Sequence, residues 1–313
     1  MIGSTGSASD GNGVYLVDYF RGLNYRVYDA FDAQVTTFTD PNLSQNDFVV
    51  TSYSNIGNHN WSAFYDNDNN EGYGLDIAVD CDGVYLSSSM HTSGVTPSGV
   101  VVSSAHDNFL LSKLNKTNGT ELWVKEFQSA FNHDDYFVGI DTDGYGNLYA
   151  TGRLRGASAS LGTDFSHSGG QIYSEVMIAH FHTDGTFQSF QLIPGMNYSW
   201  GMSIGTYKNE KYVIGGFYTG VLTFGSLTTV DNMDNAFVAL KDLAPPITYS
   251  SVSGNNIFCQ EETDPTPTLN APAGGTFSGP TEVVFANTST GEIDLDNSTP
   301  VSYTHLTLPT SSW

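Results

Sequence analysis

The chain is poor in basic residues. Lysine and arginine together number 10 against 33 acidic residues, which gives a net charge of −23 at pH 7. A field of this sign repels nucleic-acid phosphates and anionic lipid headgroups. We therefore expect no nucleic-acid partner and no membrane insertion.

Cysteines and long apolar runs are also scarce. Cys81 and Cys259 are the only cysteines, too few for a disulfide framework or a structural zinc site. No apolar run approaches the ~20 residues of a membrane-spanning helix. The first residues lack the basic and apolar regions of a signal peptide. The last ones, Ser302–Trp313, resemble a translated sequencing adapter, so we interpret the sequence as a fragment with a non-native tail at 302–313.

The composition that remains is typical of a folded all-β protein. Hydrophobic residues make up 39% and charged residues only 14%, a balance too apolar for disorder. The chain holds 33 glycines, 18 tyrosines and 19 phenylalanines, which favour short strands joined by many turns. The fold class predicted from composition is all-β.

Two sequence markers recur four times in the same order. The first is an apolar segment with a central tyrosine, at Tyr15, Tyr85, Tyr149 and Tyr212, with spacings of 70, 64 and 63 residues. The second is a nine-residue segment such as NDFVVTSYS at Asn46 or DNFLLSKLN at Asp107. Two markers that keep one order and nearly one period predict four structural repeats.

Each repeat is predicted to form four short strands. In the second, LDIAVD, GVYLSSSM, DNFLLSKLN and ELWVKEF are separated by Gly-containing turns suited to hairpins. The third of these strands is apolar on successive residues, as at Phe109, Leu110 and Leu111, so both faces of its sheet should be covered. Stacked blades of a β-propeller provide such cover. We predict a partial β-propeller of about four four-stranded blades, at about 1–70, 71–132, 133–196 and 197–245, from a ring of about six to eight.

The repeats resemble the bacterial propeller-repeat family called SBBP. The best matches are Leu75–Met90, Gly139–Gly152 and Asp234–Asp242, and the resemblance covers about residues 1–245. It implies an architecture and not an activity, because the family shares no catalytic residues. The opening segment, MIGSTGSASDGN, departs most from the pattern.

A change of composition follows Asp242. Ala244-Pro245-Pro246 forms a stiff break, and the residues after it are rich in proline, threonine and glycine. Elements such as GGTF and TGEIDL resemble immunoglobulin-like repeats of large secreted Bacteroidetes proteins. We predict a partial β-sandwich, immunoglobulin-like module at 246–301.

Metal sites are weakly indicated. The turns at Asp80–Gly83 and Asp141–Gly144 begin like calcium loops, but they stand where hairpin turns belong. The run Asp66, Asp68 and Asn70 is the better calcium candidate, although its sixth residue is Glu71 rather than the glycine of an EF-hand. His180 and His182 should share one face of a strand without a third ligand. We favour structural roles, predict no cofactor, and leave calcium as the one possible ion.

No residue is assigned a catalytic role. The sequence has no G-x-S-x-G elbow. Its arginines, Arg21, Arg26, Arg153 and Arg155, are too few to favour a sialidase, and no one carboxylate pair stands out for glycoside hydrolysis. Among the aromatics, repeat packing is the favoured interpretation of Trp61, Trp123 and Phe187. Packing is also the favoured interpretation of Tyr198 and Trp200, and stacking on a sugar is the alternative for these two.

The function predicted from these features is a non-enzymatic, secreted or cell-surface scaffold for adhesion to a protein or polysaccharide. Its contact surface should be the long loops at Thr92–His106, Arg155–Tyr173 and Thr219–Met233. The alternative is a carbohydrate-active enzyme, a hydrolase or lyase, on a propeller fold. Two or more acids clustered at the mouth of a central channel would favour the enzyme. The sequence leaves the ligand and the oligomeric state undefined.

Overall fold

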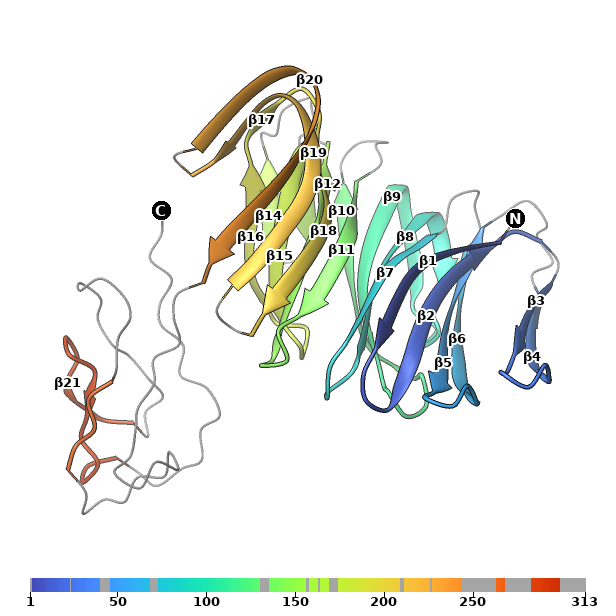
Figure 1. Ribbon diagram of the computed structural model, residues 1–313, viewed down its shortest axis with the longest axis horizontal. Coiled ribbons are helices and arrows are strands. Elements are labelled where there is room, and N and C mark those ends of the chain that lie inside the picture. The colour runs from blue at the N-terminus through green and yellow to red at the C-terminus, as the bar shows by residue number, and fades with distance from the viewer. Residues whose placement is uncertain are drawn as a thin grey trace. The chain divides into compact units, whose positions relative to one another are not determined.

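The computed structural model confirms the all-β class (Figure 1). It describes residues 2–22, 24–39, 46–67, 73–129, 135–155, 158–162, 164–168, 174–208, 211–225, 227–243, 263–267 and 283–298. Every regular element in these ranges is a strand, and they contain no helix that could span a membrane. The chain divides into two compact units, one of residues 1–208 and 212–240, the other of 209–211 and 241–313.

The first unit is built from four antiparallel meanders, in which consecutive strands pair side by side (Figure 1). Meander 1 contains β1 (Ile2–Ser9), β2 (Gly13–Phe20), β5 (Asp47–Ser54) and β6 (His59–Asn67). Meander 2 contains β7 (Tyr73–Val79), β8 (Val84–Val95), β9 (Val101–Leu114) and β10 (Glu121–Ser129). Meander 3 contains β11 (Tyr136–Thr142), β12 (Asn147–Leu154), β15 (Glu175–His182) and β16 (Phe187–Ile193). Meander 4 has three strands in the described residues, β18 (Ser199–Tyr207), β19 (Lys211–Phe224) and β20 (Leu227–Asp242).

The four marker tyrosines occupy the second strand of the four meanders. Tyr15, Tyr85, Tyr149 and Tyr212 are all buried. In the first three meanders the tyrosine faces Ser52, Lys113 or His180 on the third strand, and these lie at matching places in the second sequence marker. The two markers therefore correspond to neighbouring strands of the same sheet.

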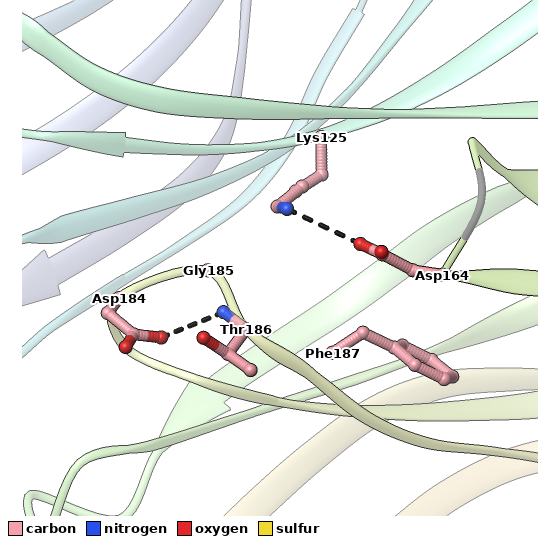
Figure 2. A pocket seen from close by; sticks show the side chains of 6 residues that line it. All are labelled: Lys125, Asp164, Asp184, Gly185, Thr186 and Phe187. Carbon is pink, nitrogen blue, oxygen red and sulfur yellow. Dashed lines mark hydrogen bonds and ion pairs between the residues drawn. The ribbon is translucent and has the colours of Figure 1, made fainter.

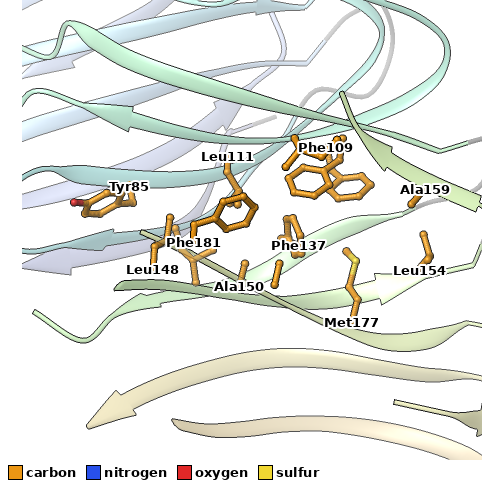
Figure 3. Packing of buried hydrophobic residues seen from close by; sticks show 14 of the residues in the cluster. Tyr85, Phe109, Leu111, Phe137, Leu148, Ala150, Leu154, Ala159, Met177 and Phe181 are labelled. Atoms are coloured by element: carbon orange, nitrogen blue, oxygen red, sulfur yellow. The ribbon is translucent and has the colours of Figure 1, made fainter. Parts of the chain in front are cut away.

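The meanders stack through their faces. Successive residues of β9 contribute to different cores: Leu110 packs in the cluster shared with meander 1, and Phe109 and Leu111 in the cluster shared with meander 3. Figure 3 shows the second of these clusters, where Phe109 and Leu111 lie with Phe137 and Phe181. The apolar runs of the sequence thus mark strands covered on both faces, as expected.

The first strands of the meanders are also neighbours. β1 contacts β7, β7 contacts β11, and β11 contacts β18. Close packing here needs small residues: a Cβ on Gly6 would lie 3.1 Å from the Asp76 Cα, and one on Gly139 would lie 2.9 Å from the Ser203 Cα. The same contact between first strands thus recurs from each meander to the next.

In the described residues, the three segments expected to be long loops are largely strands, and this corrects the prediction. The first is the end of the β8–β9 hairpin, closed by a turn from Thr96 to Val100 with Gly99 at a φ of 83°. The second includes the hairpin of β13 (Ser158–Leu161) and β14 (Phe165–Ser168), and the third lies in β19 and β20. In the first and third of these segments, β-branched residues favour the strands that extend the hairpins beyond the sheet.

These extended hairpins, here called arms, reach back to the preceding meander. Val95 of β8 pairs with Asp66 of β6, and Ala159 of β13 pairs with Ser129 of β10. Likewise β19 pairs with β17 (Gly195–Met196), which follows the fourth strand of meander 3. Meander 1 has its own arm, formed by β3 (Asn24–Tyr28) and β4 (Gln34–Thr39). In the described residues these two strands pair only with each other. No sheet in the described residues closes on itself.

The C-terminal unit is described only at 263–267 and 283–298. There β21 (Phe285–Asn287) pairs with β22 (Glu292–Ile293), and the Leu295 N–H donates to Asp264 Oδ1 at 3.0 Å. Most of the predicted module at 246–301, and the tail at 302–313, lie outside the described residues.

Candidate functional site

The aspartates of the calcium-like turns bond to their own backbone. Asp80 Oδ1 accepts the N–H groups of Asp82 and Gly83 at 2.8 and 3.0 Å. Asp143 Oδ1 accepts those of Tyr145 and Asn147 at 2.7 and 3.1 Å. These are the turn-closing bonds expected of aspartate in a hairpin. The other calcium candidate falls largely outside the described residues, because only Asp66 of its three ligands is described.

Two carboxylates on first strands join one meander to the next. Asp76 Oδ2 accepts the Ile140 N–H at 2.9 Å, and Asp141 Oδ2 accepts the N–H and hydroxyl of Thr206 at 2.7 and 2.9 Å. Burial raises the pKa of the Asp76 carboxyl, and the nearby charge of Asp141 adds to the rise. Sequence reasoning missed these bonds, although both aspartates stand out in first strands as polar residues among apolar ones. With their oxygens on backbone donors, the two acids act as links between sheets.

The histidine pair shares one face, as predicted. The rings of His180 and His182 lie 6.0 Å apart, and His180 stacks on Tyr149 at 4.5 Å. His180 Nε2 lies 3.0 Å from Asn147 Oδ1. Burial lowers the pKa of His180 to about 4. Within the described residues, no three His, Cys, Asp or Glu side chains are grouped as metal ligands.

Two tryptophans on fourth strands each bond to a turn of the next meander. The Trp61 indole N–H donates to the Lys116 carbonyl at 2.7 Å, and the Trp123 indole N–H donates to the Thr183 carbonyl at 3.2 Å. Each ring lies against a turn glycine, Gly119 in one case and Gly185 in the other. This repeated contact agrees with the packing interpretation of these tryptophans.

The sugar-stacking candidates lie beside two of the arginines. The Arg153 guanidinium carbon lies 3.6 Å from the centre of the Trp200 ring, and that of Arg155 lies 5.7 Å from the centre of the Tyr198 ring. Arg153 is buried, so its stack on Trp200 is part of the packing. Tyr198 is 45% exposed and still presents its ring to solvent. Of the two candidates, Tyr198 is therefore the one available to a ligand.

A polar cleft lies between meanders 2 and 3 (Figure 2). Its volume is about 390 Å³, and Lys125 of β10 faces Asp164 of the β13–β14 turn across it, with 3.6 Å between charged atoms. Asp184 and Thr186 of the β15–β16 turn and Phe187, the first residue of β16, complete the wall. The Asp184 carboxylate accepts the Thr186 N–H at 2.8 Å, and bonds from Thr186 lower the pKa of this acid.

A second hollow of about 400 Å³ adjoins the first, since Lys125 and Asp164 line both. Glu126, Gln128 and Ser160 contribute further polar groups. Burial raises the pKa of Glu126, and its bond from Gln128 opposes the rise. Together the two hollows, here called the β10 cleft, follow one strand and offer hydrogen-bond donors and acceptors along it. Sequence reasoning missed this cleft, because it forms where an arm crosses to the preceding meander.

Neither a protein-family model nor a curated protein matches this chain.

Proposed function

We propose that the four meanders are blades of a partial β-propeller of the SBBP type. The stacking of faces and the succession of first strands, β1, β7, β11 and β18, support this architecture. In a propeller the first strand of each blade lies nearest the central axis, where it meets the first strands of its neighbours. The C-terminal residues are proposed to form a partial immunoglobulin-like module.

On this scaffold we propose a non-enzymatic binding function, secreted or at the cell surface, with the β10 cleft as the contact site. The ligand is a protein or polysaccharide segment, and the lining of the cleft favours a polysaccharide. This lining is the observation that carries the proposal: an ammonium group, carboxylates, an amide and hydroxyl groups from β10, the β13–β14 hairpin and the β15–β16 turn line two adjoining hollows. Such groups match the alternating donors and acceptors of sugar hydroxyls.

The geometry supports a chain-like ligand over a compact one. Two adjoining hollows of about 390 and 400 Å³ share Lys125 and Asp164, so a ligand lying in both would pass over this ion pair. The Asp164 side chain is 44% exposed and can accept bonds from a ligand while it stays close to Lys125. Hydrogen bonds to charged groups are worth about 1.5–3 kcal/mol each, which corresponds to roughly a tenfold to hundredfold change in affinity.

The test is binding of the full chain to a panel of neutral and acidic glycans, measured by calorimetry. Asp164→Ala should weaken binding at least about tenfold, because a charged acceptor is lost. Asp32→Asn is the matched control, since Asp32 is exposed in the β3–β4 turn and its loss changes the net charge equally. Equal affinity of the two variants would show that the glycan binds elsewhere. Binding to no glycan would overturn the polysaccharide assignment.

One observation supports the second candidate, a carbohydrate-active enzyme. Glu126 lines the same cleft, and burial raises the pKa of its carboxyl, as in glycosidase general acids. Turnover of a bound glycan that disappears in Glu126→Gln would favour the enzyme. Binding without turnover, unchanged by this substitution, would favour the scaffold.

A further inference from the structure

The outer face of meander 4 exposes apolar residues whose counterparts in the other meanders are buried in the core. Val50, Leu111 and Ile178 stand at one place in the third strands of meanders 1 to 3, with exposures of 0%, 0% and 6%. The matching residue of meander 4 is Val238, which is 79% exposed. Leu240, two residues on and on the same face of β20, is 65% exposed. In the other meanders the next sheet of the stack covers this position.

The free edge of β20 shows the same incompleteness. The third strands β5, β9 and β15 each pair with a fourth strand, namely β6, β10 and β16. In the described residues β20 pairs with β19 alone. An occupant of this end would therefore meet both an apolar face and an edge strand that has one partner strand in the described residues, which is what another β-sheet can satisfy.

At the opposite end of the stack, meander 1 exposes the face that meanders 2 and 3 bury against the meander before them. Val84 of β8 and Leu148 of β12 are fully buried against the preceding meander, whereas Val14, at the same place in β2, is 38% exposed. The arm of meander 1 covers part of this face: the Tyr25 hydroxyl donates to Asp18 at 2.8 Å, and Phe38 stacks on Phe64 at 5.3 Å.

That arm also has an edge to offer. In meanders 2 and 3 the first strand of the arm pairs with the end of the preceding fourth strand, and in meander 4 it pairs with β17, which follows that strand. The corresponding strand of meander 1, β3, pairs in the described residues only with β4. Meander 1 thus presents the surfaces that meanders 2 to 4 use to receive the sheet before them.

We propose that a second copy of this chain occupies the outer face of meander 4. Meander 4 of one copy packs against meander 1 of the next, head to tail, and repeats the contact made three times within the chain. The contact is heterologous, because the two faces come from opposite ends of the stack. It does not depend on the ligand proposed above. Because each copy carries a net charge of −23, salt should strengthen the association by screening repulsion between copies.

Sedimentation velocity of the full chain, from about 1 to 200 µM and from low to about 0.5 M salt, tests the proposal. The wild type should form species larger than the monomer, increasingly so at high salt. Val238→Asp and Val14→Asp should each be monomeric, and both sites are exposed enough to leave folding intact. Leu122→Asp, at a residue 51% exposed on β10 in the middle of the stack, is the control and should associate like the wild type.

Mixing the two monomeric variants separates head-to-tail contact from other arrangements. Val238→Asp keeps the face of meander 1 intact, and Val14→Asp keeps the face of meander 4 intact. These two intact faces can still meet, so the mixture should regain a dimer. If Val14→Asp alone still associates, the contact joins two identical faces and the proposal is wrong. A wild type that stays monomeric also overturns the proposal. If Val238→Asp then lowers the stability of this monomer, the face is covered by the chain's own C-terminal unit and not by a second copy.

Discussion

Replacing Trp61 with phenylalanine should weaken the contact between meanders 1 and 2. The Trp61 side chain is 6% exposed, its N–H donates to the Lys116 carbonyl at 2.7 Å, and its ring packs against Tyr15. The lost hydrogen bond is worth about 1 kcal/mol. The smaller ring removes buried carbon worth about 1–2 kcal/mol. We expect Trp61→Phe to lower the free energy of unfolding by about 2–3 kcal/mol.

Trp123→Phe is the matched comparison within the same chain. Its bond to the Thr183 carbonyl is longer, 3.2 Å, and its ring is only partly buried, so we expect a loss of about 1 kcal/mol. Urea unfolding followed by far-ultraviolet circular dichroism measures both, because the signal does not depend on the tryptophans removed. Equal losses, or a loss below about 0.5 kcal/mol for Trp61→Phe, would refute the assignment of stability to this contact.

A double-mutant cycle with Gly119 isolates the packing. A Cβ at Gly119 would lie 2.4 Å from Trp61 Cε3, and the residue has a φ of 71°. Gly119→Ala should therefore lower the free energy of unfolding for two reasons: the new Cβ clashes with the Trp61 ring, and alanine is strained at a positive φ. In a Trp61→Ala background the clash is gone, which leaves the backbone cost of about 1–2 kcal/mol. An unchanged cost in that background would mean that the ring does not press on the turn.

Two further stability predictions concern buried polar groups. The pKa of His180 is about 4 in the folded chain against about 6.5 when unfolded, so the unfolded state binds the proton first. Stability should fall by up to about 3 kcal/mol as pH drops from about 6.5 to 4, and His180→Gln should remove that slope in urea titrations at several pH values. Asp141→Ala should cost about 1–3 kcal/mol, because the backbone and hydroxyl donors of Thr206 lose their acceptor. Thr206→Val removes one of these bonds and should cost less, and the reverse order in thermal melts would contradict the account.

The sequence alone determined the fold class and the succession of the main strands within the meanders, but not the strands of the arms. The apolar triplets such as Phe109–Leu111 indicated sheets covered on both faces, and the recurrent tyrosines located the second strand of each meander. These features are legible because the period of a strand and the residue needs of a hairpin turn are local properties. The turn aspartates could be assigned for the same reason, since their bonds join residues two to four positions apart.

Only the tertiary structure decided how the meanders are joined and where a ligand has room. The bonds from Trp61 to Lys116 and from Asp141 to Thr206 span 55 and 65 residues. The segments predicted as loops became arms because their strands find partners in the preceding meander, and the β10 cleft exists only where one arm crosses over. Such contacts depend on which surfaces meet after stacking, and no local pattern encodes that. The exposure of Val238 has the same origin: its sequence matches its buried counterparts, and only the absence of a neighbouring sheet in the described residues sets it apart.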